Sequence, residues 1–214
     1  MIILGITGGS GVGKTTVSNI FRNNGIDVID TDIVAREIVK PSMPALSEIR
    51  DYFGVEFINP DGTLNRKKLA GVVFNDPEKL KILNKITHKY ISEYVTSYIK
   101  EYKKDIIGID GAALIESGIN NMCDYVISVL ADKKIRIERI KIRDNLSELE
   151  AKNRISSQKS DDFYIENSDF LVYNNGKDIN DLEHEIKNII LNLRRRAWKK
   201  EEENTDRDHY YFYC

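Results

Sequence analysis

The sequence predicts an α/β fold in which a parallel sheet is covered by helices on both faces. Two observations predict it: short apolar runs alternate with longer segments of helical periodicity, and a glycine-rich turn joins the first such run to the first helix. Alternation of this kind is typical of doubly wound sheets with right-handed crossovers. The chain has 214 residues, 41% of them hydrophobic, which is enough for one such core and excludes a disordered chain.

Five segments are expected to be strands because they are short and apolar. The first of them is β-branched and ends in Gly-Gly, and we expect it to be a buried central strand. In chain order the expected strands are Ile2–Thr7, Asp27–Asp30, Asp105–Asp110, Tyr125–Leu130 and Phe170–Tyr173.

The segments between the strands carry apolar residues at helical spacing and are expected to be helices. Asp76 suits the N-cap of the longest one, and Pro77 suits its first turn. The segment 135–143 also alternates in a way that fits a strand, but its charge density favours a helix. Ser147 and Glu150 form the pattern of a capping box. The expected helices are Thr15–Arg22, about Ile33–Val39, Asp76–Tyr102, Ile135–Arg143, Ser147 to about Ser157, and Asp178–Arg196.

Charge and composition exclude several classes of function. A net charge of -2 and a pI near 6.0 give no global basic field, so we expect no nucleic-acid partner and only a local anion site. Two distant cysteines and three scattered histidines predict neither a disulfide framework nor a zinc cluster. The N-terminus lacks the features of a signal peptide, and no run is long enough to span a membrane. We therefore expect a cytoplasmic protein with no membrane partner.

The strongest local signal is GGSGVGKT, from Gly8 to Thr15, which satisfies the pattern G-x-x-x-x-G-K-[ST]. A loop that wraps a phosphate must point several N–H groups inward, which requires backbone angles that glycine adopts most easily. Lys14 is expected to reach the β- and γ-phosphates of ATP, and the Thr15 hydroxyl suits Mg²⁺. A dinucleotide-binding fold has no role for this lysine and threonine. The expected ligands of this P-loop are Gly9, Gly11, Val12, Gly13, Lys14, Thr15 and Thr16.

Acidic residues at the ends of two strands indicate what the nucleotide is used for. In a doubly wound sheet, ligands sit beyond the carboxyl ends of the strands. Asp32 is therefore placed to orient or deprotonate an acceptor hydroxyl, and to contact Mg²⁺ through water. Asp30 and Asp32 fit equally well an alternative role, capping the next helix. Asp110 is either a further water-mediated contact of Mg²⁺ or a solvated strand end.

Several motifs in the same order resemble those of the dephospho-CoA kinases. TGGSGVGKTTVSNIF and the following IDVIDTDIVAREIV are similar to the start of that family, whose catalytic aspartate coincides with Asp32. The resemblance covers roughly residues 2–195, and it implies transfer of the γ-phosphoryl group of ATP to the ribose 3′-hydroxyl of dephospho-CoA, the final step of coenzyme A biosynthesis. Its other motifs are DGTLNR at 61–66, Arg154-Ile155 with Gln158, and Ser168-Asp169-Phe170 through Asn174-Asn175-Gly176.

The chain departs from the family's pattern at two places. It has His88-Lys89 where the family usually has His-Pro, and GAALIE at 111–116 where the family usually has a P-L-L-f-E run. In the family these positions lie near the acceptor pocket, so the resemblance leaves the shape of that pocket open. His88 is expected to be a packing or surface residue without a chemical role.

Four arginines concentrate positive charge between the fourth and fifth strands: Arg136, Arg139, Arg143 and Arg154. Planar guanidinium groups suit the charge that spreads over a transferred phosphoryl group. The resemblance implies that this region, about 132–166, is a mobile lid, whose closure would exclude water. Arg139 and Arg154 are the candidates for a catalytic role, and the alternative for any of the four is a salt bridge on a solvated helix face.

Together these expectations describe one kinase domain over residues 1–196, with a helical acceptor-binding insertion over about 40–104 and the lid. Residues 197–214 have no period and are expected to be a disordered tail. The expected partners are ATP and dephospho-CoA, and the expected assembly is a monomer or a weak homo-oligomer. Two alternatives stay open: a P-loop kinase of another nucleoside or nucleotide, and a nucleotide-dependent switch or adaptor, whose GTPase version is disfavoured because no Asn-Lys-x-Asp motif is evident.

Overall fold

The computed structural model describes the backbone of residues 1–176 and 178–211, and the side chains of residues 1–176 and 178–197. Its strands form a sheet of order β2-β3-β1-β4-β5, and β1 pairs in parallel with β3 and β4, as β4 does with β5. This confirms the predicted parallel sheet with β1 inside it. The strands are β1 (Ile2–Thr7), β2 (Asp27–Asp30), β3 (Ile106–Asp110), β4 (Tyr125–Leu130) and β5 (Phe170–Tyr173).

The chain divides into two compact units. Unit 1 comprises residues 1–29 and 103–214, and unit 2 comprises residues 30–102. The expected insertion at 40–104 thus corresponds to a unit that begins ten residues earlier, directly at the end of β2.

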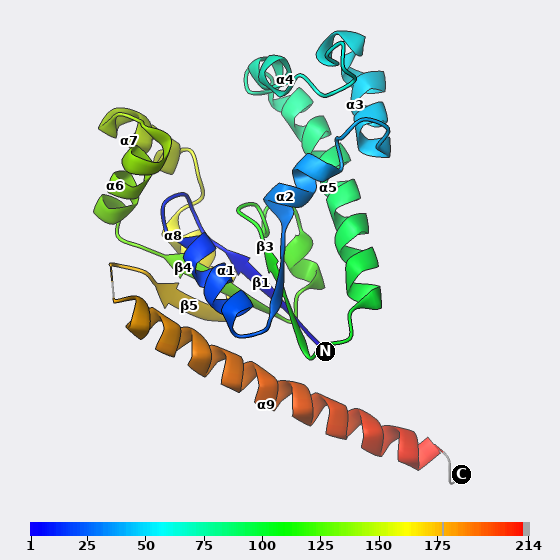
Figure 1. Cartoon of the computed structure of the whole chain (residues 1–214), viewed down its shortest axis with the longest axis vertical. Coiled ribbons are helices and arrows are strands. Elements are labelled where there is room, and N and C mark those ends of the chain that lie inside the picture. The colour runs from blue at the N-terminus through cyan, green and yellow to red at the C-terminus, as the bar shows by residue number, and fades with distance from the viewer. Residues whose placement is uncertain (177, 212–214) are drawn as a thin grey trace. The chain divides into compact units, whose positions relative to one another are not determined.

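The helices of unit 1 include α1, which packs with α9 beside the sheet (Figure 1). Alternate residues of β1, among them Leu4 and Ile6, join one apolar core with Phe21 of α1 and Ile186 of α9. Gly5 faces the other side of the sheet, where the segment 111–123 approaches it through Leu114. The helices of unit 1 are α1 (Lys14–Asn23), α6 (Lys133–Asp144), α7 (Glu148–Ser156), α8 (Asp161–Glu166) and α9 (Ile179–Tyr211), with a short 3₁₀ helix at Ile119–Met122.

The final helix is longer than the sequence analysis expected. Its buried residues Leu182, Ile186, Ile190 and Leu193 recur at helical spacing and pack on the core. The backbone continues as a helix past Arg196, the expected end of this helix, to Tyr211. Glutamate, lysine and arginine are frequent in this stretch, and all three are good helix formers even without an apolar face. The remaining tail residues, 212–214, lie outside the described part of the chain.

The α6–α7 hairpin is held by a small apolar cluster of its own. Ile137 and Ile140 of α6 pack with Ala151 of α7. This apolar stripe explains why 135–143 is a helix and not a strand, as expected. The capping box before α7 is also confirmed, because the Ser147 N–H donates to Glu150 Oε2 and the Glu150 N–H donates to Ser147 Oγ.

Unit 2 is helical throughout its described length, apart from turns and one isolated bridge between Ile58 and Leu64. Asp76 caps α5 as expected, since its Oδ1 accepts hydrogen bonds from the N–H groups of Glu78 and Lys79. The helices of unit 2 are α2 (Thr31–Glu37), α3 (Pro44–Phe53), α4 (Arg66–Val73) and α5 (Pro77–Glu101), with a 3₁₀ turn at Val55–Phe57.

Candidate phosphate-binding site

The loop between β1 and α1 has the backbone conformation that the glycine pattern predicts. Gly8, Gly11 and Gly13 have φ angles of 145°, 80° and 91°, which disfavour residues with a side chain. At Gly11 there is also no room for one, because a Cβ would lie 2.7 Å from the carbonyl oxygen of Arg136. α1 begins at Lys14 without a side-chain cap. Its first N–H groups and its positive dipole end are therefore directed to the loop, an arrangement that binds phosphate.

Asp110 lies at the end of β3 and holds two residues of α1. Lys14 Nζ donates to Asp110 Oδ1 at 2.8 Å, and Ser18 Oγ donates to Oδ2 at 2.7 Å. The Asp110 side chain is 7% exposed, which excludes the alternative of a solvated strand end. The register places Asp110 beside Ile6, one residue before β1 ends, so the sheet itself brings the carboxylate to the P-loop.

Oxygen donors near the start of α1 fit Mg²⁺. The Thr15 side chain is exposed in the first turn of the helix, and the Asp110 carboxylate stands at the adjacent strand end. Among the described residues there is no group of three or more histidine, cysteine or acidic side chains that could hold a metal. A site with few protein oxygens suits magnesium, which keeps several waters and takes its remaining ligands from phosphates.

Ser10, at the tip of the loop, is held by side chains from α6 and from the segment after α7. Its N–H donates to Gln158 Oε1 at 2.8 Å, and Gln158 Nε2 donates to Ser10 Oγ at 3.1 Å. Arg136 Nε donates to the Ser10 carbonyl oxygen at 3.0 Å, while its Nη1 donates to Asp161 of α8 at 2.9 Å. Arg136 is only 3% exposed. This buried arginine therefore ties the P-loop to two helices of the expected lid.

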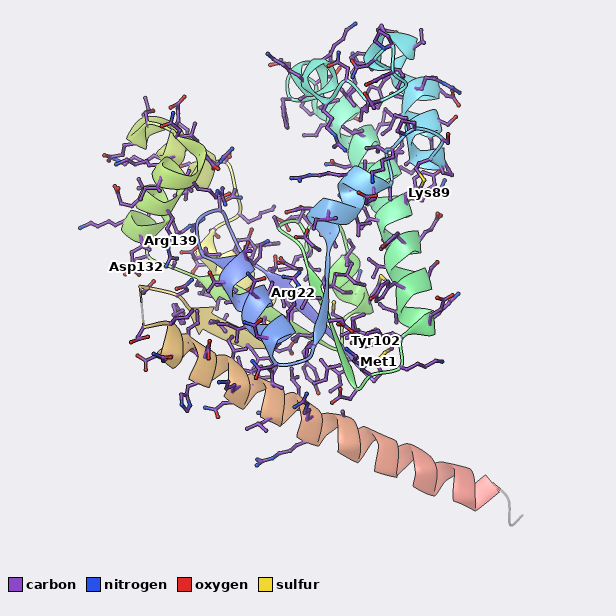
Figure 2. All side chains as sticks on the ribbon, viewed as in Figure 1. Met1, Arg22, Lys89, Tyr102, Asp132 and Arg139 are labelled. Atoms are coloured by element: carbon purple, nitrogen blue, oxygen red, sulfur yellow. The ribbon has the colours of Figure 1, made fainter. Side chains whose placement is uncertain are left out.

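The other half of the loop is held by Arg139 and Asn174. Arg139 Nη1 donates to the carbonyl oxygens of Gly11 and Val12, and its Nη2 donates to Asn174 Oδ1. Asn174 Nδ2 in turn donates to the Val12 carbonyl oxygen at 2.9 Å. Figure 2 shows Arg139 on α6, the helix that lies beside the loop. These hydrogen bonds to its carbonyl groups hold the backbone of the loop in place.

Two buried polar atoms close to the loop have no hydrogen-bond partner among the described residues: Thr7 Oγ1 and Arg136 Nη2. Thr7 is the last residue of β1, and Arg136 Nη2 lies against Gly9. Buried polar groups are rarely left unpaired, so each of these two atoms is a candidate to bond a water, an ion or a ligand.

Arg154 occupies a different environment from Arg139. It ion-pairs with Asp144 at the end of α6, and Asp144 also pairs with Arg143. The hydrogen bond from Arg143 is the main reason that the pKa of Asp144 lies below its ordinary value. Arg154 and Arg143 therefore match the alternative of a salt bridge on an exposed helix face in this conformation, whereas Arg136 and Arg139 do not.

In unit 2 the structure distinguishes the roles of Asp30 and Asp32, which the sequence alone left open. Asp30 caps α2, because its Oδ1 accepts from the N–H groups of Asp32 and Ile33 at 2.9 and 3.0 Å. Asp32 itself is exposed in the first turn of α2. Because Asp32 and the P-loop belong to different units, their catalytic pairing stays a prediction.

Comparison with known proteins agrees with these features. The family model described as dephospho-CoA kinase matches residues 2–180, most of the chain. The chain belongs to the dephospho-CoA kinase family. A dephospho-CoA kinase of Lactobacillus acidophilus is 35% identical over 90% of this chain and 97% of its own length. One of Bacillus cereus is 40% identical over 82% of this chain and 89% of its own length.

Solved structures agree with the fold. A protein from Thermus thermophilus, TT1252, superposes with a TM-score of 0.78 at 28% identity, covering 90% of this chain and 97% of that one. The dephospho-CoA kinase from Campylobacter jejuni gives a TM-score of 0.66 at 26% identity, with the same coverage. A shikimate kinase from Acinetobacter baumannii, at 15% identity and a TM-score of 0.51, shares the fold alone.

At the first departure from the family's pattern, the Lys89 side chain contacts another helix. Lys89 Nζ donates to Glu48 Oε2 at 3.1 Å, and the Tyr90 hydroxyl donates to the same oxygen at 2.8 Å. Lys89, which is labelled in Figure 2, and Tyr90 thus connect α5 to α3. His88, expected to be a packing or surface residue, is half-buried in α5.

Sequence reasoning missed Ser18 and ranked Arg136 too low. Ser18 lies one turn after Lys14 on α1, and Arg136 lies one turn before Arg139 on α6. Both residues could have been found from the sequence, because each lies one helical turn from a residue that had already been identified, Lys14 or Arg139. Gln158 and Asn174 were noticed only as parts of family motifs, because their partners in the P-loop are remote in sequence.

Proposed function

We propose that this chain transfers the γ-phosphoryl group of ATP to the ribose 3′-hydroxyl of dephospho-CoA, giving ADP and coenzyme A. The single observation that carries the nucleotide half of this proposal is the P-loop with Lys14 held at its mouth by Asp110. Family membership carries the acceptor half.

The residues of unit 1 bind and orient the nucleotide. The loop N–H groups and the dipole of α1 hold the phosphates, and Lys14 supplies a mobile positive charge to the β- and γ-phosphates. Thr15 would hold Mg²⁺ directly, with Asp110 or Asp32 reaching it through water. The bound ion would neutralise charge on the β- and γ-phosphate oxygens.

Asp32 is proposed to accept the proton of the ribose hydroxyl. Asp30 is the N-cap of α2, and Asp32 lies exposed in the first turn of that helix. An exposed carboxylate in the first turn of a helix can accept a hydrogen bond from an alcohol. As the hydroxyl oxygen attacks the γ-phosphorus, the bond to the bridging oxygen of ADP breaks and the proton passes to Asp32.

The lid arginines are proposed to stabilise charge on the transferred phosphoryl group. Arg139 already contacts the loop, and Arg154 would reach the nucleotide by exchanging its exposed pair with Asp144 for phosphate oxygens. An exposed ion pair contributes little stability, so this exchange has a small cost.

The test is an acceptor panel with purified protein, ATP and Mg²⁺, in which ADP release is measured. We expect ADP to form with dephospho-CoA at least about a hundredfold faster than with nucleosides, nucleotides or shikimate, as expected of a site that uses the whole acceptor. Equal rates with a nucleotide would favour a different small-molecule kinase. Phosphate release without an acceptor, stimulated by a protein partner, would favour a nucleotide-dependent switch.

We also propose a cytoplasmic monomer or weak homo-oligomer. In the described part of the chain, no helix combines the length and the apolar character needed to cross a bilayer. Sedimentation at several protein concentrations, with and without substrates, tests the assembly state.

A further inference from the structure

The side chain of Gln158 binds Ser10, at the tip of the P-loop, through two atoms at once. The Ser10 N–H donates to Gln158 Oε1 at 2.8 Å, and Gln158 Nε2 donates to Ser10 Oγ at 3.1 Å. An amide side chain has both a donor and an acceptor, so it can close a ring with one serine in this way. The two-point contact fixes the orientation of Gln158 as well as its distance from the loop.

Gln158 lies two residues beyond the end of α7 and continues the last turn of that helix. Its N–H donates to the carbonyl oxygen of Ile155 at 3.2 Å. Arg154 of α7 lies four residues before Gln158. Four residues of an α-helix rise by about 6 Å, so the backbone of Arg154 lies about one turn from the contact with the loop.

The α6–α7 hairpin is attached to Ser10 at both of its open ends. Near the start of α6, Arg136 Nε donates to the Ser10 carbonyl oxygen at 3.0 Å, and after the end of α7, Gln158 binds the Ser10 N–H and hydroxyl. Between these ends, Ile140 and Ala151 belong to the apolar cluster that joins the two helices to each other. The apolar cluster holds the hairpin together, whereas the two polar side chains relate it to the P-loop.

We propose that Gln158 is a positioning residue for phosphoryl transfer, which holds the end of α7 on the P-loop and so directs Arg154 to the transferred phosphoryl group. The proposal rests on the function proposed above and on the role proposed there for Arg154. An arginine that leaves its exposed pair with Asp144 has many rotamers, and ordering them has an entropic cost. A fixed backbone position reduces the volume that the guanidinium must search before it meets the phosphate.

Support of the loop alone is the competing explanation for the same contact. The loop backbone is also bound at its carbonyl oxygens by Arg136, Arg139 and Asn174. These three contacts persist when Gln158 is replaced, so the loop should still bind ATP. The two explanations therefore differ in what they predict: lost support of the loop weakens ATP binding, whereas a misplaced Arg154 slows the transfer step.

The test is a double-mutant cycle that combines Gln158→Met with Arg154→Gln. Gln158→Met keeps the length of the side chain and removes both hydrogen bonds to Ser10. Asn167→Leu is the matched control, since the Asn167 amide donates to the Phe163 carbonyl oxygen one helical turn before it. The single-turnover rate of coenzyme A formation and the dissociation constant of ATP are measured for the wild type, the three single variants and the double variant.

In Gln158→Met we expect the single-turnover rate to fall by about tenfold, an effect within the range for a slightly misplaced catalytic group. The dissociation constant of ATP should stay within about twofold, because the loop keeps its other hydrogen bonds. In the Arg154→Gln background, Gln158→Met should cost less than about twofold in rate, because the effects of two residues that act together are not additive. Asn167→Leu should resemble the wild type.

Hydrogen exchange of the amides in the last turn of α7 provides a second measurement, which needs no turnover. Gln158→Met should speed this exchange by about tenfold, because it releases the end of the helix from the loop, and Asn167→Leu should not. If Gln158→Met fails to fold, Ser10→Ala removes the contact with Gln158 Nε2 and should show the same non-additivity with Arg154→Gln.

Three results would overturn the assignment: an unchanged rate in Gln158→Met, an equal loss of rate in the wild-type and Arg154→Gln backgrounds, or unchanged exchange in α7. A loss of rate that is matched by an equal rise in the dissociation constant of ATP would assign Gln158 to support of the loop alone. If the wild-type protein makes no coenzyme A from dephospho-CoA, the proposed function itself fails, and the exchange measurement still shows whether Gln158 holds α7 on the loop.

Discussion

The P-loop in unit 1 and the cavity in unit 2 are built in opposite ways. The loop is bound by polar side chains from far along the chain: Gln158, Arg136 and Asn174 lie 148, 126 and 162 positions from their partners in the loop. The cavity, about 270 Å³ between α2, α4 and α5, has an inner wall of buried apolar residues, and its exposed lining residues include Arg66 and Asn84. Phosphate charge needs fixed dipoles, whereas an apolar hollow selects what it binds by shape. Substitutions at the P-loop should therefore affect the nucleotide.

Lys14→Met should have the largest effect, because it removes the mobile charge of the P-loop. We expect kcat/KM to fall by about a thousandfold, at the upper end of the loss for one transition-state donor. Asp110 keeps the hydrogen bond from Ser18, so the fold should persist in circular dichroism. Lys104→Met is the matched control, since Lys104 pairs with Asp27 on the surface of the same unit. A loss below tenfold in Lys14→Met would contradict the assigned role.

Arg154→Gln should lower kcat by roughly ten- to a hundredfold, because it removes one guanidinium from the developing phosphoryl charge. Asp144→Asn removes the acceptor of its exposed ion pair but leaves the arginine, so kcat should stay within about twofold. The two variants are compared in single-turnover experiments. An equal loss of kcat in both variants would mean that activity depends on the salt bridge itself and that Arg154 does not act on the nucleotide.

Arg136→Met should raise KM for ATP by about tenfold and leave KM for dephospho-CoA within twofold. It removes a charge-assisted hydrogen bond to the Ser10 carbonyl, which contributes roughly 1.5–3 kcal/mol. Arg136→Lys should recover only part of the affinity, since an ammonium lacks the planar fork that bonds Ser10 and Asp161 together. Lys134→Met, an exposed cation of the same helix, is the control. If both KM values rose equally, the arginine would serve the fold and not the loop.

The smallest expected effect is a pH dependence from His88 in unit 2. Burial lowers the pKa of His88, so the unfolded chain takes up a proton on this residue at a higher pH than the folded chain does. Stability is therefore present above the unfolded pKa of about 6.5 and is lost as the pH falls toward the lower folded value. Between pH 7 and 5, the urea midpoint of His88→Gln should fall less than that of the wild type. His184→Gln, at an exposed site on α9, should behave as the wild type.

The sheet and the P-loop could be predicted from sequence because their signals are local. Buried strands are short apolar runs, and the loop pattern reflects backbone angles at Gly8, Gly11 and Gly13. The capping box before α7 is local in the same way.

Elements whose signals depend on context were harder to predict. Pro44 breaks helical periodicity for the chain before it, yet it stands in the first turn of α3, where its missing N–H is not needed. α4 and α8 are too short for periodicity to be distinctive. The division of roles between Asp30 and Asp32 required coordinates, because both residues suit a helix cap and only geometry shows which one accepts the N–H groups.

The most direct test of the account is Asp32→Asn, compared with Asp30→Asn. Asparagine caps a helix as well as aspartate does, so Asp30→Asn should keep α2 and near-normal turnover. In Asp32→Asn the dissociation constant of ATP, measured by titration calorimetry, should stay within about twofold. Its single-turnover rate of coenzyme A formation should fall by about a hundredfold or more, as expected for loss of a general base. Normal turnover in Asp32→Asn would contradict the central claim that this carboxylate activates the acceptor hydroxyl.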